Sequence, residues 1–287
     1  MANAVTYRRA VGELAVFFGC DADEESVYRY RLEARDYASA LLRATNTQLL
    51  LVDDGYPPPG EGTPWRQLGE LAGCEARPVL RIERVAAALG VEAVPTQVAA
   101  ARRNGFAGLK TIAAYRTGLE QERIHAFVVA ALEANEATGR PLPVQVHCGF
   151  GDSDLYLARA DPSHLKPLIE RFRETPFVLL HCYPFVREAG WLAHVYGNVW
   201  FDLSLTIPHV ARPAETLRQA LELAPVSKLL YASDAARTPE LYYLAARWWR
   251  EALAEVLPEL FGVDAEWAAW RVLRENALAL YGEVSPG

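Results

Sequence analysis

Short apolar runs alternate with longer amphipathic segments along most of the chain. Each run is about six residues long and mostly apolar, as in strands that are buried on both faces. The runs are QLLLVD (48–53), PVLRIE (78–83), FAGLKT (106–111), PVQVHC (143–148), FVLLHC (177–182), VWFDLS (199–204) and LLYASD (229–234). Their spacing fits a strand, a loop and a crossover helix in each unit. The pattern therefore predicts a parallel sheet with helices outside it.

The segments between these runs have helical periodicity. We expect helices over 23–44, 64–74, 84–90, 95–103, 118–139, 161–174, 185–196, 211–224, 239–256 and 264–282. The pairs Asp161-Pro162 and Thr238-Pro239 are typical helix starts, because proline is favoured in the first turn. The Pro- and Gly-rich segment GYPPPGEGTP (55–64) predicts a long loop after the first strand, a type of loop that often carries function.

Seven strands with intervening helices favour an α/β (β/α)₈ TIM-barrel-like fold in which one strand is missing or hidden. A doubly wound open sheet is the alternative. That fold usually carries a glycine-rich phosphate loop after its first strand, and neither G-x-G-x-x-G nor G-x-x-x-x-G-K-[ST] occurs here. The chain has no internal repeat and no convincing linker, so we predict a single barrel domain over residues 1–287.

Composition and charge exclude several classes of protein. Apolar residues make up 51% of the 287 residues, which predicts a folded protein, and the net charge of −7 argues against a broad nucleic-acid surface. No apolar run approaches the length of a membrane span, and the N-terminus does not resemble a signal peptide. The four cysteines form no C-x-x-C pair, so we expect free thiols in a reducing, cytoplasmic compartment.

Polar residues gather at the carboxyl ends of the predicted strands. They are Asp53, Glu83, Lys110, His147, His181, Asp202 with Ser204, and Asp234. In a barrel these ends meet at one mouth, where active sites lie. Neutral imidazole and carboxylate bind divalent transition metals, and catalytic zinc usually has three protein ligands. His147 and His181, at the same register on successive strands, and Asp234 on the last strand supply that number. They predict a metal or catalytic site.

Other polar residues are better explained by structural roles. His125, His164 and His194 lie in helical segments, and His209 in a loop is a weaker site candidate. Because strand side chains alternate, Cys148 and Cys182 should face away from the histidines that precede them and be buried and inert. Asp53 and Asp54 fit either a helix N-cap or a site acid. No G-x-S-x-G elbow is present, which argues against serine hydrolase chemistry.

Four stretches carry a specific resemblance to a known family. They are FAGLKTIAAYRTGL (106–119), VQVHCGFGDSDLYLARADPSHLKPLIE (144–170), FVLLHCYPFVREAGWLAHVYGNVWFDLSL (177–205) and KLLYASDA (228–235). With them the chain resembles the amidohydrolase superfamily, in particular amidohydrolase family 2. Within this group it is most similar to the domains associated with glutamine-synthetase-like and nodulin-like proteins. The resemblance covers nearly the whole chain and implies a metal-dependent hydrolase barrel.

The resemblance also implies roles for individual residues. His147 and His181 correspond to the metal-binding histidines of the fifth and sixth strands. Asp234 corresponds to the aspartate of the eighth strand, a metal ligand and general base. Lys110 falls where some relatives place a metal-bridging carboxylated lysine, and the alternative is contact with an anionic substrate group. Zinc is the expected metal, and manganese and iron suit the same donors.

One departure from the family concerns the first strand, which ends in His-x-His in relatives. No such pair occurs in this sequence. The resemblance makes residues 5–18 a helix, which the apolar face of Ala10, Leu14 and Phe18 supports, whereas pattern alone also allows a strand over 14–19. We expect either a chain that begins late or natural loss of the strand. In both cases two metal ligands would be absent and sheet edges exposed.

The leading hypothesis is hydrolysis of an amide or related C–N bond in a small, carboxylate-bearing substrate. A divalent metal would activate water, Asp234 would transfer its proton, and His181 or the metal would polarise the carbonyl. Arg116 would hold the carboxylate, unless it is only a surface charge. A non-hydrolytic lyase or decarboxylase and a non-catalytic ligand-binding barrel are the alternatives. Homo-oligomerisation is left open, because the aromatic helix at 241–253 suits either core or interface.

Overall fold

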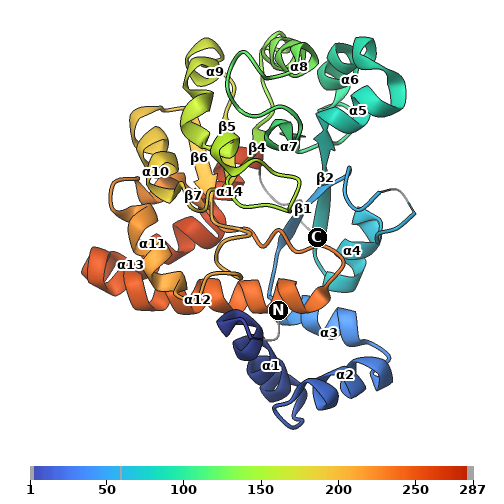
Figure 1. Ribbon diagram of the computed structural model, residues 1–287, viewed down its shortest axis with the longest axis vertical. Helices are drawn as coiled ribbons and strands as arrows, with labels where there is room; N and C mark the ends of the chain where they lie inside the picture. The colour runs from blue at the N-terminus through green and yellow to red at the C-terminus, as the bar shows by residue number, and fades with distance from the viewer. Residues whose placement is uncertain (1–2, 59, 283–287) are drawn as a thin grey trace.

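Seven parallel strands form one curled sheet in the computed structural model, which describes residues 3–58 and 60–282. The strands follow sequence order from β1 to β7, and helices cover the outside of the curl (Figure 1). They are β1 Leu49–Asp53, β2 Glu75–Arg81, β3 Gly108–Thr111, β4 Val144–Cys148, β5 Phe177–His181, β6 Val199–Asp202 and β7 Leu229–Leu230. The α/β barrel class is confirmed. The single domain over 1–287 stays a prediction, and its two ends lie outside the described residues.

The helices occupy most of the predicted segments. They are α1 Val5–Phe18, α2 Glu24–Glu33, α3 Tyr37–Ala44, α4 Trp65–Ala72, α5 Ile82–Leu89, α6 Val94–Ala100, α7 Ala113–Arg116, α8 Ala126–Glu136, α9 Lys166–Arg171, α10 Val186–Val195, α11 Pro213–Leu221, α12 Pro239–Phe261, α13 Ala265–Trp270 and α14 Asn276–Tyr281. The helix over 5–18 is confirmed. The helix predicted over 23–44 divides into α2 and α3, and the one over 264–282 is interrupted by a π-helical turn over 271–275.

The two faces of the sheet are covered by different groups of side chains. Val146, Leu179 and Phe201 are in register, face outward and are buried in the main core beneath the helices. On the inner face, Val178, Leu180 and Leu230 form a small cluster against α14. The curl therefore has an apolar floor, and the polar residues at the carboxyl ends of the strands lie at its mouth.

β1 and β7 do not pair with each other, so the curl is open along one side. All five residues of β1 are only partly buried, whereas β3 and β5 are buried throughout. Side chains link the two sides of this seam: Arg237 forms an ion pair with Glu61 at 2.9 Å, and Arg274 donates to the Gln48 side chain at 2.7 Å. The expected exposure of a sheet edge is therefore observed at β1.

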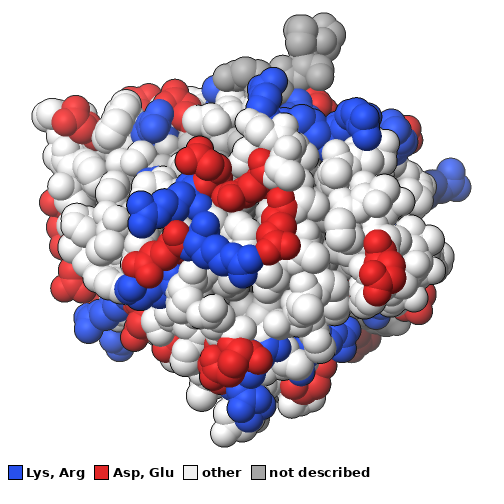
Figure 2. Space-filling model, turned by 90° about the horizontal axis from the view of Figure 1, so that it is seen from above, with Lys and Arg blue, Asp and Glu red and all other residues white. Residues whose placement is uncertain are grey.

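Charged side chains of both signs lie close together on the face shown in Figure 2. Exposed ion pairs are frequent in the structure, for example Lys166–Glu170 at 2.7 Å and Arg218–Glu259 at 2.9 Å. Such pairs add little to stability, because solvent and salt screen the attraction between exposed charges. Among the described residues, no helix is long and apolar enough to cross a membrane.

Candidate active site

A cavity of about 1880 Å³ runs from the mouth of the curled sheet down to its apolar floor. It is lined by all five residues that the sequence assigned to a site, which are Lys110, Arg116, His147, His181 and Asp234. These residues come from the ends of three strands, from the loop that follows β7 and from the short helix α7. The fold thus brings together side chains that are up to 124 positions apart in the chain.

His147 and His181 lie side by side with unpaired nitrogens. Their ring centroids are 4.4 Å apart, and both residues are buried. The Nε2 atom of each ring is buried without a hydrogen-bond partner. Burial lowers the pKa of both histidines well below its usual value, and Lys110 lowers each further. Both rings are therefore neutral at pH 7, the form in which imidazole binds a metal.

The prediction that the two histidines lie at the same register of their strands is wrong by one residue. His147 pairs with Leu180, whereas His181 pairs with Cys148. Alternation alone would turn His181 toward the outer core, where the Cys148 side chain is buried. The backbone at His181 instead has a φ of +68°, which turns its side chain into the cavity. Cys182, at a φ of +65°, is buried in the main core, so both predicted cysteine placements are confirmed.

Left-handed backbone is unfavourable for residues other than glycine, and each such residue costs about 1–3 kcal/mol. At His181 two neighbours hold it in place. Asp202 Oδ1 accepts a hydrogen bond from the His181 backbone N–H at 2.8 Å, and Thr206 donates its hydroxyl to the His181 carbonyl at 2.7 Å. Strained backbone held by surrounding contacts is frequent at functional sites. Thr206 is a site residue that sequence reasoning missed, because no local pattern distinguishes it.

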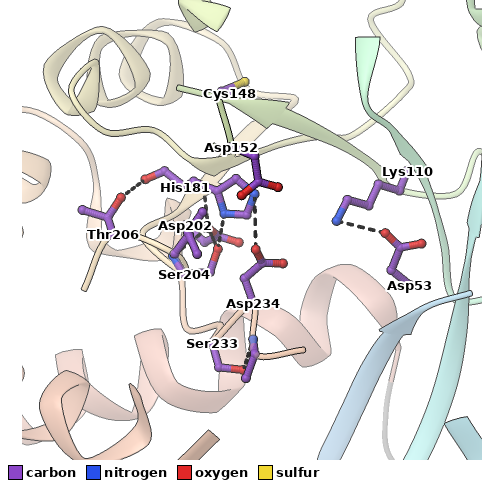
Figure 3. Close-up of polar contacts among 12 residues, drawn as sticks. Asp53, Lys110, Cys148, Asp152, His181, Asp202, Ser204, Thr206, Ser233 and Asp234 are labelled. Carbon is purple, nitrogen blue, oxygen red and sulfur yellow. Dashed lines mark hydrogen bonds and ion pairs between the residues drawn. The ribbon is translucent and has the colours of Figure 1, made fainter. Parts of the chain in front are cut away.

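Asp234 lies beside His181 but not at the end of a strand. β7 stops at Leu230, and Asp234 follows in a loop with a φ of +48°. Its Oδ2 atom is 3.9 Å from His181 Nε2, beyond hydrogen-bond distance, and its side chain is 36% exposed (Figure 3). The predicted strand over 229–234 was therefore too long. The loop nevertheless places the Asp234 carboxylate beside the His181 ring.

On the opposite side of the cavity, Lys110 forms an ion pair with the Asp53 carboxylate. Its Nζ atom lies 3.0 Å from Asp53 Oδ2 (Figure 3). Arg81 contacts the same carboxyl group. Burial by itself raises the pKa of Asp53, but Lys110 and Arg81 together lower it below its usual value. Asp53 is thus a cavity residue rather than a helix cap, and Asp54 binds the Arg81 backbone N–H and the Arg84 side chain.

Arg116 is an exposed cation at the mouth. It ends α7 and lines the cavity. Within the part of the chain that the structure describes, it has no ion-pair partner, whereas Arg81, Arg84 and Arg237 each bind a carboxylate. Its guanidinium is therefore available to an anionic group that enters the cavity.

Tyr115 and Gly151 were not predicted, and they border the His147 ring. The rings of Tyr115 and His147 have centroids 4.5 Å apart, and the Tyr115 hydroxyl accepts the Asp152 backbone N–H at 3.0 Å. A Cβ atom on Gly151 would overlap the Tyr115 hydroxyl and lie 3.2 Å from His147 Nε2. Glycine at this position therefore keeps open the space in front of that nitrogen.

Several other candidates lie away from this cavity. Glu83 is in the first turn of α5 rather than at a strand end, and it binds the Thr111 hydroxyl and the Ile112 backbone. His209 contacts the Leu205 carbonyl at 2.7 Å. None of the four remaining histidines lines the cavity, in agreement with structural roles; they are His125, His164, His194 and His209.

The donor set at the mouth suits a divalent metal in part. Two orphaned imidazole nitrogens and a nearby carboxylate are the expected ligand types, and Gly151 leaves room before one of them. Within residues 3–58 and 60–282, however, no three His, Cys, Asp or Glu side chains are already grouped as a metal cluster. His147, His181 and Asp234 are the residues that would hold such a metal.

The family model for amidohydrolases matches residues 63–282, a range that includes all five predicted site residues. This chain belongs to the amidohydrolase family. A solved structure from Lactobacillus casei ATCC 334, described as a candidate metal-dependent hydrolase, is similar over 98% of this chain and 85% of its own. Its TM-score is 0.84 and its identity 29%. Membership of this family, together with the similarity to that structure, supports an enzyme of the hydrolase type.

Two further likenesses are more limited. A TIM-barrel protein from Bordetella bronchiseptica has a TM-score of 0.53 at 13% identity over 94% of both chains, which shows the fold alone. Protein fluG of Emericella nidulans is 44% identical over 128 residues, which is 44% of this chain and 15% of that protein. This chain therefore matches a small part of protein fluG. The match supports in part the narrower resemblance that the sequence motifs indicated.

Proposed function

We propose that this amidohydrolase hydrolyses an amide or related C–N bond in a small substrate that carries a carboxylate. The observation that carries the proposal is the pair of buried, unpartnered Nε2 atoms of His147 and His181 next to the Asp234 carboxylate. Similarity to a metal-dependent hydrolase supports a divalent metal in general. Zinc suits these donors best, and manganese or iron are alternatives.

In this proposal His147, His181 and Asp234 hold the metal. When bound, the metal lowers the pKa of water from 15.7 toward about 7, so that hydroxide is available at neutral pH. Asp234, which is partly exposed to the cavity, accepts the proton of the attacking water and passes it to the leaving amine. Arg116 binds the substrate carboxylate by two parallel hydrogen bonds. Lys110 holds Asp53 in place and adds positive charge at the mouth.

The cavity is large enough to admit a small substrate together with water. The four cysteines are free, which supports the proposed reducing, cytoplasmic compartment.

Metal content per chain, measured by mass spectrometry on protein purified without chelator, is the first test. We expect about one metal per chain in the wild type and none in a double variant with His147→Ala and His181→Ala. Wild-type protein that stays metal-free when zinc or manganese is supplied would refute the proposed site.

The role of Asp234 is tested by Asp234→Asn in an amide-substrate screen. Turnover should be lost while the thermal midpoint changes little, because the carboxylate accepts no close hydrogen bond from another described side chain. Asp264→Asn, which alters an exposed carboxylate just before α13 that does not line the cavity, is the matched control and should keep full turnover. Equal turnover in the two variants would remove Asp234 from the mechanism.

A further inference from the structure

Ser204 lies between the His181 ring and the Asp202 carboxylate. Its Oγ atom is 2.7 Å from His181 Nδ1 and 2.7 Å from Asp202 Oδ1 (Figure 3). All three residues are at least 97% buried. Short hydrogen bonds therefore connect these three side chains in a part of the site that solvent does not reach.

The direction of these hydrogen bonds follows from the number of donors. Asp202 Oδ1 already accepts the backbone N–H groups of His181 at 2.8 Å and Ser204 at 2.9 Å, so it acts as an acceptor. The single hydroxyl hydrogen of Ser204 points to Oδ1. Ser204 Oγ then has only lone pairs left for His181 Nδ1, and the ring must donate to it. The hydrogen of the neutral ring is thus on Nδ1.

This tautomer places the lone pair of His181 on Nε2, the atom that faces the cavity without a partner. We propose that Ser204 and Asp202 are positioning residues, which fix the His181 tautomer and ring orientation so that Nε2 is presented to a divalent cation. The inference rests on the proposed metal site.

The pentapeptide Asp202-Leu-Ser-Leu-Thr206 makes this arrangement with alternate residues. Asp202 binds the His181 backbone N–H, Ser204 binds its ring and Thr206 binds its carbonyl. Two of these contacts hold the strained backbone, and one holds the ring. Ser204→Ala and Thr206→Val therefore each remove one buried hydroxyl that contacts His181, but only the first changes the environment of Nδ1. The second is therefore a matched control for the tautomer.

The tautomer is measured by two-bond ¹H–¹⁵N NMR spectra of metal-free protein labelled with ¹⁵N-histidine. The His181 signals are assigned by their loss in His181→Gln. We expect a protonated Nδ1 and an unprotonated Nε2 in the wild type and in Thr206→Val. In Ser204→Ala, and in Ser204→Cys where sulfur is a weak acceptor, a substantial fraction of the ring should carry its hydrogen on Nε2. The cysteine variant keeps most of the side-chain volume if the alanine variant folds poorly.

Zinc affinity is the second readout. Loss of the group that orients a metal-binding histidine typically weakens metal binding 10- to 100-fold, and we expect this loss for Ser204→Ala. Thr206→Val removes a contact to the strained His181 backbone, so it should also weaken zinc binding, but without a change of tautomer. A wild-type ring protonated on Nε2, an unchanged tautomer in Ser204→Ala, or the same change of tautomer in both variants would overturn the inference. Failure to hydrolyse any amide would refute the proposed reaction but leave the tautomer result standing.

Discussion

Gly151→Ala is expected to block the site with one methyl group. Gly151 has no positive φ, so the backbone accepts alanine without strain, and the effect is purely steric. The new Cβ would overlap the Tyr115 hydroxyl, lie 2.7 Å from Tyr115 Cζ and lie 3.2 Å from His147 Nε2. Since Tyr115 also packs on the His147 ring, the methyl would be inserted where a metal or substrate must approach that nitrogen.

The size of the effect follows from these contacts. The phenol must move by roughly 1 Å to relieve the overlap, and its hydrogen bond to the Asp152 backbone N–H is then lost. Overpacking of this kind costs about 1–3 kcal/mol in the free energy of unfolding. A displacement of about 1 Å at a catalytic site can lower activity by about 100-fold. We therefore expect a folded protein with a modest loss of stability and a large loss of metal binding and turnover.

The assay compares Gly151→Ala with Gly197→Ala. Gly197 also lacks a positive φ, and a Cβ atom there meets no other atom within 4 Å. Zinc titration by calorimetry, turnover of the best amide substrate and the thermal midpoint are measured for both variants. Zinc affinity and turnover in Gly151→Ala that equal those of Gly197→Ala would show that the space before His147 Nε2 is not used.

Two further predictions concern stability and substrate binding. Asn276 donates its buried side-chain amide to two backbone carbonyls at 2.8 and 2.9 Å, so Asn276→Leu should lower the free energy of unfolding by about 2–4 kcal/mol. An unchanged urea midpoint would contradict this. Arg116→Gln should raise KM for a carboxylate-bearing substrate at least about 10-fold while kcat changes little, because it removes a charged two-point contact. An equal change in KM for the corresponding neutral amide would show that Arg116 does not bind the carboxylate.

The periodicity of the sequence identified the strands and helices because burial on both faces and amphipathic helical faces are local patterns. The helix over 5–18 was found in this way and matches α1. The ends of the strands and helices were predicted less accurately. The run ending at Asp234 continued past β7 because its apolar residues pack on neighbouring helices without pairing to a strand: Tyr231, for example, packs against Trp249 of α12.

The site was predictable in composition but not in geometry. Two histidines and an aspartate at the ends of apolar runs were sufficient to predict a metal-binding mouth. Whether Asp53 capped a helix or faced the cavity depended on Lys110 and Arg81, which are distant in sequence. Tyr115, which packs on His147, gave no signal, because a single aromatic residue after a strand has no distinctive pattern.

The sequence by itself determined the order of strands and helices, the family and the chemical types at the mouth, since these depend on local patterns and motifs. The tertiary structure alone decided that His181 enters the cavity. Strand alternation would have turned it outward, and the left-handed backbone that redirects it is stabilised by Asp202 and Thr206, 21 and 25 residues away. A local conformation that costs free energy is populated only when distant contacts compensate for it, so no local pattern could have revealed it.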